Sequence, residues 1–295
     1  MTTHDAARLL DALGLAASTR LGPDVPLTGL ARDADAGPGD AAWLSARALS
    51  DDRLAGFGGS LLVAPAEADA SLVPESAAVV ACESPRLAFS RLAERMALPA
   101  ADPGWPRSET ALPPDLVMGR DVHIARGSVL GAGVVLGDGV RVGPGACLAH
   151  CTLGEGVRVG PNSTIGTEGF GVSRDADGAL VPFPHVGRVV LHDGVSVGAN
   201  TCIDRGALGD TVVGAHTRID NHVHIAHNAQ IGARCLVIAH AVVAGSVTIG
   251  DDAWIAPGAL IRNGLSVGAG ATVGMGAVVV RDVPAGATVK GNPAR

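Results

Sequence analysis

Aromatic side chains are scarce in this sequence: Trp and Phe together make up 2 % of the 295 residues, and there is no tyrosine. Apolar residues nonetheless account for 47 %, so any core must be built from Val, Ile, Leu and Ala. The length is sufficient for one large domain or two ordinary ones. Glycine, with 41 residues, has about double its usual share. Many glycines among small β-branched residues favour short strands that meet at tight corners.

The sequence also has no excess of positive charge and no long apolar run. A net charge of −7 at pH 7 argues against a nucleic-acid-binding surface, which requires a basic face. No apolar stretch approaches the ~20 residues that span a membrane. The first residues, "MTTHDAARLLDALGL", lack the basic flank and long apolar segment of a secretion signal. We therefore expect a cytoplasmic protein.

Cysteines are few, odd in number and scattered, which fits reduced thiols in the cytosol. The five are Cys82, Cys147, Cys151, Cys202 and Cys235. The segment "CLAHC" resembles a cluster of metal ligands, but no second ligand pair follows at the spacing of a zinc site. We expect no metal there.

A six-residue period of aliphatic residues organises the chain from about residue 118 onward. It slips by one residue at Leu153, is interrupted after Ile165, and resumes at Leu191. Its longest unbroken run has twelve members: Val213, Ile219, Ile225, Ile231, Val237, Val243, Ile249, Ile255, Ile261, Val267, Val273 and Val279. Chance in an Ala- and Val-rich chain does not produce such a run.

Neither a helix nor a simple hairpin strand has a period of six, whereas a hexapeptide repeat has one short strand and one corner per six residues. Three such repeats make one coil, with the aliphatic residue of each repeat pointing inward. Stacked coils pair their strands in parallel and bury a continuous aliphatic column. Known hexapeptide prisms wind left-handed, against the usual crossover rule. The resemblance to them implies a left-handed parallel β-helix at residues 117–295.

The first hundred residues lack this period and predict a small α/β domain at residues 1–100. "AARLLDALGL" has the pattern of an amphipathic helix, and "SPRLAFSRLAERMA" predicts a second helix with Ser84 as a possible cap before Pro85. "GSLLVAPAEA" and "SAAVVACESP" predict buried strands ended by turn residues. Residues 101–116, rich in Pro and Asp, are the expected linker.

Histidines gather in "IDNHVHIAHNAQIG", residues 219–232. His227 lies two residues after inward Ile225, and Gly245 lies 18 residues after His227, so Gly245 should stack one coil above it. His222 and His240 are also 18 residues apart and should stack on each other.

Two alternatives to catalysis stay open for these histidines. A zinc site needs three converging neutral imidazoles at ~2.0–2.1 Å, and a third ligand beside His222 and His240 is not indicated. For His216, His222 and His224, a solvated or capped polar residue is the simplest interpretation.

Four segments together resemble the signature of the UDP-3-O-acylglucosamine N-acyltransferases of lipid A biosynthesis. They are "IGTEGFGV", "PHVGRVVL", "VSVGANTCIDRGALGDTVVG" and "IDNHVHIAHNAQIG". The resemblance implies transfer of a fatty acyl group from acyl carrier protein to the 2-amino group of a UDP-sugar. It also implies a homotrimer with sites between subunits. The family's catalytic histidine falls on His227, and the backbone amide that holds its oxyanion falls on Gly245.

Further substrate contacts are expected at Asn228, His240, Asp220 and Trp43. Asp220 lies on a different face of its own prism, so it reaches His227 only across a subunit boundary. No acid that orients His227 is evident from the sequence. No metal or other cofactor is expected, since the acyl thioester is a co-substrate.

The sequence departs from the family in three places. The family stacks uracil between two aromatic residues; Trp43 keeps the first, but Leu49 occupies the second and Ala46 replaces a polar contact. A histidine often found near the acyl donor is replaced by Gly264. The family's basic C-terminal helix is missing after "VKGNPAR", which predicts weak electrostatic steering of an acidic carrier protein.

The chemistry agrees with the placement of His227. An amine attacks a thioester only as the free base, and a histidine with a pKa near 6.5 can remove a proton at cellular pH. We therefore expect an N-acyltransferase that uses a carrier-protein or coenzyme A thioester. The alternatives are a relative that acylates a different amine in specialised metabolism, and a non-catalytic β-helix scaffold.

Overall fold

The computed structural model describes residues 1–96 and 112–294. The chain divides into two compact units. One contains residues 1–100 and 171–186, and the other contains residues 101–170 and 187–295. Most of the expected linker, at residues 101–116, lies outside the described residues. Among the described helices, none combines the length and apolarity needed to cross a bilayer.

The N-terminal unit is a small α/β domain built on one sheet. In the described part, five strands lie in the order β1-β5-β4-β3-β2, with β1 antiparallel to β5 and the other neighbours parallel. The strands are β1 (Ser18–Arg20), β2 (Gly29–Leu30), β3 (Asp40–Trp43), β4 (Leu61–Pro65) and β5 (Ala78–Cys82). The helices are α1 (Thr3–Ala12), α2 (Asp51–Ala55) and α3 (Pro85–Arg95), with short 3₁₀ turns η1 (Ala46–Ala48) and η2 (Ala70–Leu72).

Local sequence explains where these helices begin. A reciprocal capping box between Thr2 and Asp5 opens α1, as the N-terminal N–H groups of a helix require partners. Pro85 occupies the first turn of α3, where its missing N–H costs nothing. Ser84 is at the N-cap as predicted, but its side chain makes no capping hydrogen bond.

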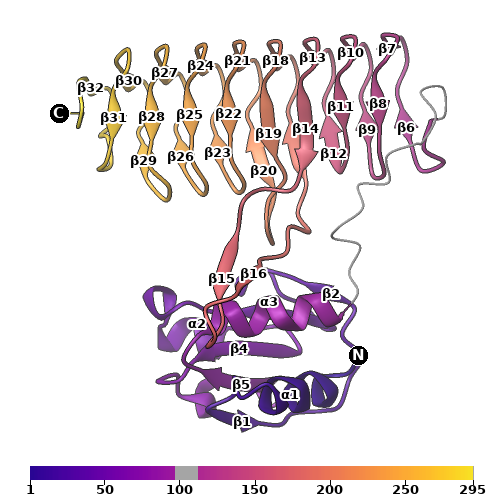
Figure 1. Cartoon of the computed structure of the whole chain (residues 1–295), viewed down its shortest axis with the longest axis vertical. Helices are drawn as coiled ribbons and strands as arrows, with labels where there is room; N and C mark the ends of the chain where they lie inside the picture. Colours follow the sequence, from indigo (N-terminus) through magenta and orange to yellow (C-terminus); the bar gives the residue numbers. More distant parts are fainter. Residues whose placement is uncertain (97–111, 295) are drawn as a thin grey trace. The chain divides into compact units, whose positions relative to one another are not determined.

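A hairpin inserted in the second half of the chain belongs to the N-terminal unit. It consists of β15 (Val172–Arg174) and β16 (Leu180–Pro182), paired antiparallel. Both strands contact α3 (Figure 1). The sequence predicted one β-helix domain over residues 117–295 and did not predict that the hairpin packs in the N-terminal unit. An interruption in the six-residue period does not show where the inserted residues pack.

Aromatic and ionic contacts hold the hairpin in that unit. The buried Phe183 ring lies 5.9 Å from Trp43 and 6.2 Å from Phe89. Arg91 Nη2 pairs with Asp175 Oδ2 at 2.9 Å. Phe183 is 5 % exposed, and burial of such a ring contributes about 1.5–3 kcal/mol.

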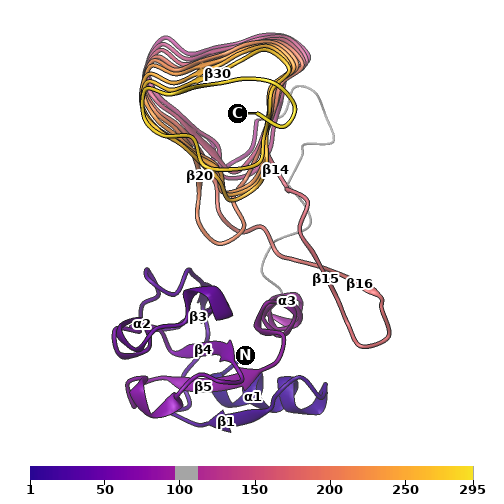
Figure 2. The same cartoon turned by 90° about the vertical axis from the view of Figure 1, so that its left-hand side faces the viewer.

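The second unit is a three-sided parallel β-helix, seen along its axis in Figure 2. Its described strands form three sheets of nine, eight and eight members. The first sheet contains β7 (His123–Ile124), β10 (Arg141–Val142), β13 (Arg158–Val159), β18 (Ser196–Val197), β21 (Arg218–Ile219), β24 (Leu236–Val237), β27 (Trp254–Ile255), β30 (Thr272–Val273) and β32 (Thr288–Val289). The second contains β8 (Val129–Leu130), β11 (Cys147–Leu148), β14 (Thr164–Thr167), β19 (Cys202–Asp204), β22 (His224–Ile225), β25 (Val242–Val243), β28 (Leu260–Ile261) and β31 (Val278–Val279). The third contains β6 (Val117–Met118), β9 (Val135–Leu136), β12 (Cys151–Leu153), β17 (Val189–Leu191), β20 (Thr211–Val213), β23 (Gln230–Ile231), β26 (Thr248–Ile249) and β29 (Ser266–Val267).

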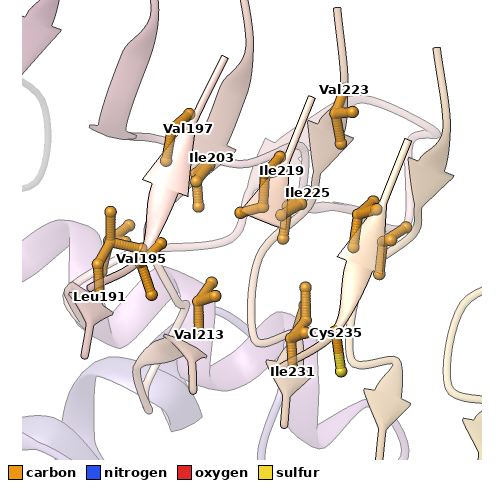
Figure 3. Packing of buried hydrophobic residues seen from close by; sticks show 14 of the residues in the cluster. Leu191, Val195, Val197, Ile203, Val213, Ile219, Val223, Ile225, Ile231 and Cys235 are labelled. Carbon is orange, nitrogen blue, oxygen red and sulfur yellow. The ribbon is translucent and has the colours of Figure 1, made fainter. Parts of the chain in front are cut away.

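The aliphatic column lies inside this prism as the period predicts (Figure 3). Ile219 pairs with Val237, and Ile225 pairs with Val243, so one coil consists of three repeats. All twelve members of the long run are at most 3 % exposed. The buried cluster contains aliphatic residues, alanines and two cysteines but no aromatic residue within the described chain. The predicted fold class, a parallel β-helix preceded by a small α/β domain, is confirmed.

Corners of the prism impose a left-handed backbone conformation. Asn228, His222 and His240 have φ angles of 62°, 57° and 60°. Non-glycine residues rarely adopt such angles, but Asn, Asp and His are enriched among those that do. The corner geometry therefore accounts for several of the polar residues in the histidine-rich segment.

Candidate functional site

The candidate site lies on one edge of the β-helix, where the chain passes from the second sheet to the third. We call it the histidine edge and define it by the corners at residues 205–210, 226–229 and 244–247. The inserted hairpin also leaves the β-helix at this transition, between β14 and β17. The coils of this edge therefore carry the main departures from the six-residue repeat.

His227 follows β22 on this edge and is half-buried. Its Nδ1 lies 2.9 Å from Asn228 Oδ1, which also accepts the Ala207 N–H at 3.1 Å. The Asn228 N–H donates to Thr211 Oγ1 at 2.9 Å, which fixes the asparagine. Because Asn228 Oδ1 is an acceptor, His227 Nδ1 must donate. The neutral imidazole then carries its basic lone pair on Nε2.

Gly245 stacks directly against the His227 ring, one coil farther along. A Cβ added at Gly245 would lie 2.8 Å from both Cε1 and Nε2 of His227, so a side chain does not fit. The Ser246 N–H donates to the His227 carbonyl at 2.9 Å, and the Gly264 N–H donates to the Gly245 carbonyl at 3.0 Å. The Gly245 N–H has no acceptor among the described residues. The predicted stacking of Gly245 over His227 is confirmed.

A buried carboxylate, not singled out from the sequence, lies one coil before this pair. Asp204 ends β19 and is 8 % exposed. Its Oδ2 lies 3.7 Å from His224 Nε2, beyond hydrogen-bond distance. The available signal is its position directly after inward Ile203, which directs Asp204 outward on the second sheet.

Burial favours the uncharged forms of both members of this pair. It raises the pKa of Asp204 to about 7. Burial, and then the nearby His227, lower the pKa of His224. The distance between Asp204 and His224 alone would suggest an ion pair. The raised pKa of Asp204 and the lowered pKa of His224 both oppose an ion pair at neutral pH. Burial dominates, because a separation of 3.7 Å is too long for the hydrogen bond that stabilises buried charges.

Arg205, the residue after Asp204, has a structural role. It is 6 % exposed, and burial lowers its pKa to about 10. Its Nε donates to the Gly187 carbonyl at 2.6 Å, which ties the end of the insertion to the corner at residues 205–210. This hydrogen bond holds the corner at residues 205–210 in place, and with it Ala207, which donates to Asn228.

Two of the other expected contacts lie at a different corner, between the first and second sheets. Asp220 accepts the Asn221 N–H at 2.8 Å and the Ala239 N–H at 3.2 Å. The His222 and His240 rings stack 5.0 Å apart with an interplanar angle of 8°, as their spacing predicts. Within one chain, the structure therefore does not bring Asp220 or His240 to the edge that carries His227.

No metal site is evident in the part of the chain that the structure describes. No group of three or more His, Cys, Asp or Glu side chains there is arranged to hold an ion. The stacked rings of His222 and His240 face each other, whereas ligands must point their nitrogens at one centre.

Trp43, in the N-terminal unit, lies at the end of β3, with its ring edge-on to Phe183 at an interplanar angle of 65°. Leu49 packs against a cluster of buried residues in the same unit, and Ala46 is exposed. Phe183, the aromatic neighbour of Trp43, comes from the inserted hairpin, so sequence proximity could not reveal it. Gly264, with φ of 71°, has open space beside it.

Comparison with known proteins gives matches of limited length. The family model "Bacterial transferase hexapeptide (six repeats)" matches residues 115–150 and 246–281. A UDP-3-O-acylglucosamine N-acyltransferase of Caulobacter sp. (strain K31) is 52 % identical over 69 residues, 23 % of this chain and 20 % of that protein. Its counterpart in Francisella tularensis subsp. holarctica (strain FTNF002-00 / FTA) is 49 % identical over 70 residues, 24 % of this chain and 21 % of that protein. The chain thus matches about a fifth of the length of these relatives.

Solved structures share the β-helix at lower identity. A UDP-N-acetylglucosamine acyltransferase from Bacteroides fragilis is 24 % identical, with a TM-score of 0.56, over 62 % of this chain and 70 % of that one. The one from Campylobacter jejuni is 22 % identical, with a TM-score of 0.54, over 62 % and 73 %. The chain therefore has the hexapeptide β-helix fold of these structures, and over a short segment its sequence resembles the UDP-3-O-acylglucosamine N-acyltransferases.

Proposed function

We propose that this protein is an N-acyltransferase. It moves an acyl group from an acyl-carrier-protein or coenzyme A thioester to the amine of a UDP-amino sugar such as UDP-3-O-acylglucosamine. The observation that carries this proposal is the arrangement of His227, whose ring is oriented by Asn228 and stacks on the backbone of Gly245. The resemblance to named N-acyltransferases supports the reaction class.

Each part of this arrangement has a chemical task. The amine nitrogen attacks the thioester carbon. At the same time, His227 Nε2 removes a proton from this nitrogen. The carbonyl oxygen becomes an oxyanion, and the Gly245 N–H donates to it, as backbone donors do in other acyl-transfer sites. The C–S bond then breaks, and His227 returns the proton to the thiolate. A base so placed contributes typically ~10²–10⁴-fold, and the reaction needs no covalent enzyme intermediate and no cofactor.

We further propose a homotrimer, acting in the cytoplasm, with the sites between copies. The outer face of the second sheet supports association, because apolar Val242, Leu260 and Val278 lie in register on it. Leu260 is 41 % exposed in the single chain. Contact with a second copy would cover this row and bring another copy's Asp220 and His240 toward the histidine edge.

A second acceptor class also has support. A uracil ring stacked between two aromatics needs a partner facing Trp43, and Leu49 is instead an aliphatic residue that packs, partly buried, against the domain core. Phe183 meets Trp43 edge-on and so does not form the second wall. A relative that acylates a different amine is therefore the alternative to the UDP-amino sugar.

Mass spectrometry of reaction products tests the proposal. Acyl-carrier-protein and coenzyme A thioesters are incubated with UDP-3-O-acylglucosamine, UDP-glucosamine and simple amines. We expect an amide product with a UDP-amino sugar, lost in His227→Gln and kept in His222→Gln. Acylation of other amines alone would favour the second acceptor class. Unchanged turnover by His227→Gln would overturn the assigned base.

A further inference from the structure

Proton balance in the proposed reaction points to a group besides His227. An amino sugar near neutral pH arrives largely as an ammonium ion with three N–H bonds, and the amide product keeps one. Of the two protons lost, His227 delivers one to the leaving thiolate. The other must leave the nitrogen before attack, because an ammonium ion has no lone pair. The search for a group that removes this first proton rests on the proposed function.

Asp204 is the carboxylate placed for that step. Adjacent strands of a sheet lie about 4.8 Å apart, and register puts β19 directly below β22, with Cys202 opposite His224 and Ile203 opposite Ile225. Asp204 therefore lies beneath Ala226, next to the corner that holds His227. Gly245 lies on the opposite side of the His227 ring. Carboxylate, imidazole and backbone N–H thus follow one another over three successive coils.

The surroundings of Asp204 do not give its carboxylate a hydrogen bond that would explain its burial. Its side chain is 11 % exposed, and its recorded polar neighbour among the described residues, His224 Nε2, lies 3.7 Å away, beyond hydrogen-bond distance. Buried carboxylates in proteins are normally hydrogen-bonded or paired, because an unpaired buried charge is costly. By contrast, Asp210 accepts the Arg188 N–H, and Asp220 accepts two corner N–H groups.

We propose that Asp204 receives the acceptor's ammonium group and removes its first proton, which then passes to His224 and solvent. The N–H bond of the ammonium breaks, its electron pair stays on nitrogen, and the proton goes to a carboxylate oxygen of Asp204. His224 continues the outward row of Val242 on the second sheet, and 44 % of its side chain is exposed in the single chain. In the proposed trimer, it connects the buried acid to water in the cleft between copies. The free amine then attacks on the side of His227.

The ionisation of this pair suits the task. Burial places the pKa of Asp204 at about 7, so the carboxylate can both accept and release a proton near neutral pH. Other ionisable groups on the surrounding elements are Cys202 on β19, Glu168 after β14, Arg205 and His227. Of these, Cys202 has a thiol pKa that is raised by burial and then by the nearby Asp204.

Calorimetry tests the proposal without any acyl donor. UDP-glucosamine is titrated into the full-length protein at pH 7 in buffers of different ionisation enthalpy, which gives the number of protons released. We expect release of roughly half a proton or more in the wild type and none in Asp204→Asn. UDP-glucose, which lacks the amine, should release none. Asp252→Asn, the same change at a remote corner, should behave as the wild type.

Kinetics give a second readout. Asp204→Asn should lower kcat/KM by about 10²-fold with the ammonium acceptor. With an alkoxyamine analogue, whose nitrogen is already neutral at pH 7, the kcat/KM of Asp204→Asn should stay close to that of the wild type. His227→Gln should lose activity with both acceptors, because each must still lose a proton during attack.

The outcomes separate the two proposals. Failure of UDP-glucosamine to bind the wild type would overturn the UDP-amino sugar acceptor and the role of Asp204 with it. Binding with unchanged proton release in Asp204→Asn would overturn the role of Asp204 alone. Equal loss of activity with both acceptors would assign Asp204 a structural role and also overturn the proposal.

Discussion

Replacement of the buried carboxylate of Asp204 by an amide should stabilise the protein at alkaline pH and leave it unchanged in acid. The structure holds the pKa of Asp204 at about 7 instead of its ordinary value of 3.8, because the ionised side chain is buried. At 1.36 kcal/mol per pH unit, this difference corresponds to about 4 kcal/mol. Relaxation of the surroundings and water penetration around the ionised carboxylate reduce that figure, so we expect a gain of about 2 kcal/mol for Asp204→Asn at pH 8.

The sign follows from proton linkage. A pKa raised on folding means that the native state binds more protons than the unfolded state between about pH 4 and pH 7. Stability that is fully present below pH 4 is therefore lost as the pH rises through 7. The amide of the Asp204→Asn variant cannot ionise, so the variant escapes this loss. The wild-type and variant stabilities should coincide near pH 4 and diverge up to about pH 8.

Urea unfolding followed by circular dichroism measures the effect at pH 4, 6 and 8 at one fixed protein concentration. Equal m-values show that the midpoints report stability. Asp252→Asn is the matched control, because Arg234 lowers the pKa of this exposed carboxyl and no gain at pH 8 is expected. A midpoint difference between Asp204→Asn and wild type that does not grow from pH 4 to pH 8 would refute the burial argument.

Four further outcomes are expected. His227→Gln should lower kcat by ~10²-fold or more with a modest change in KM, while His222→Gln keeps most activity. Steady-state kinetics of both variants checks this prediction, and an active His227→Gln enzyme contradicts it. Gly245→Ala should lower both activity and thermal stability, because its Cβ would overlap the His227 ring; a fully active variant would show that the ring moves freely. Activity should persist after EDTA treatment, and loss that zinc restores would favour a metal site. Trp43→Ala should weaken UDP-sugar binding by up to about tenfold, as measured by calorimetry, and unchanged affinity would remove Trp43 from the acceptor site.

The β-helix is predictable from the sequence because its core is a local property. Each inward residue, such as Ile225, recurs at a fixed spacing and meets its equivalent one coil later, Val243. That one rule also predicts the stacking of His222 on His240 and of Gly245 on His227. Sequence period therefore determines which side chains are neighbours along each edge of the prism.

Contacts made by insertions do not follow that rule. Phe183 leaves the period and packs against Trp43 and Phe89, and no spacing in the sequence specifies those partners. Asp204 likewise lies where the register is irregular, because the pairing shifts between Ile165 and Thr167 and places Thr167 opposite Asp204. The period predicts only that its side chain points outward, and an outward side chain is usually solvated. The features that the sequence could not predict are thus concentrated where the repeat is interrupted.

Backbone conformation separates the crowded histidines into two groups. His216, His222 and His240 occupy corner positions with φ near 60°, where a residue other than glycine must tolerate the left-handed region. The corner geometry is therefore a sufficient reason for a histidine at each of these three positions. At the histidine edge, Asn228 occupies the equivalent position with φ of 62°, so the corner geometry gives no reason for a histidine at residue 227. The fold does not require a histidine at residue 227. Because the His227 ring is oriented by the neighbouring amide of Asn228 and stacks on Gly245, where no side chain fits, a chemical role explains it best.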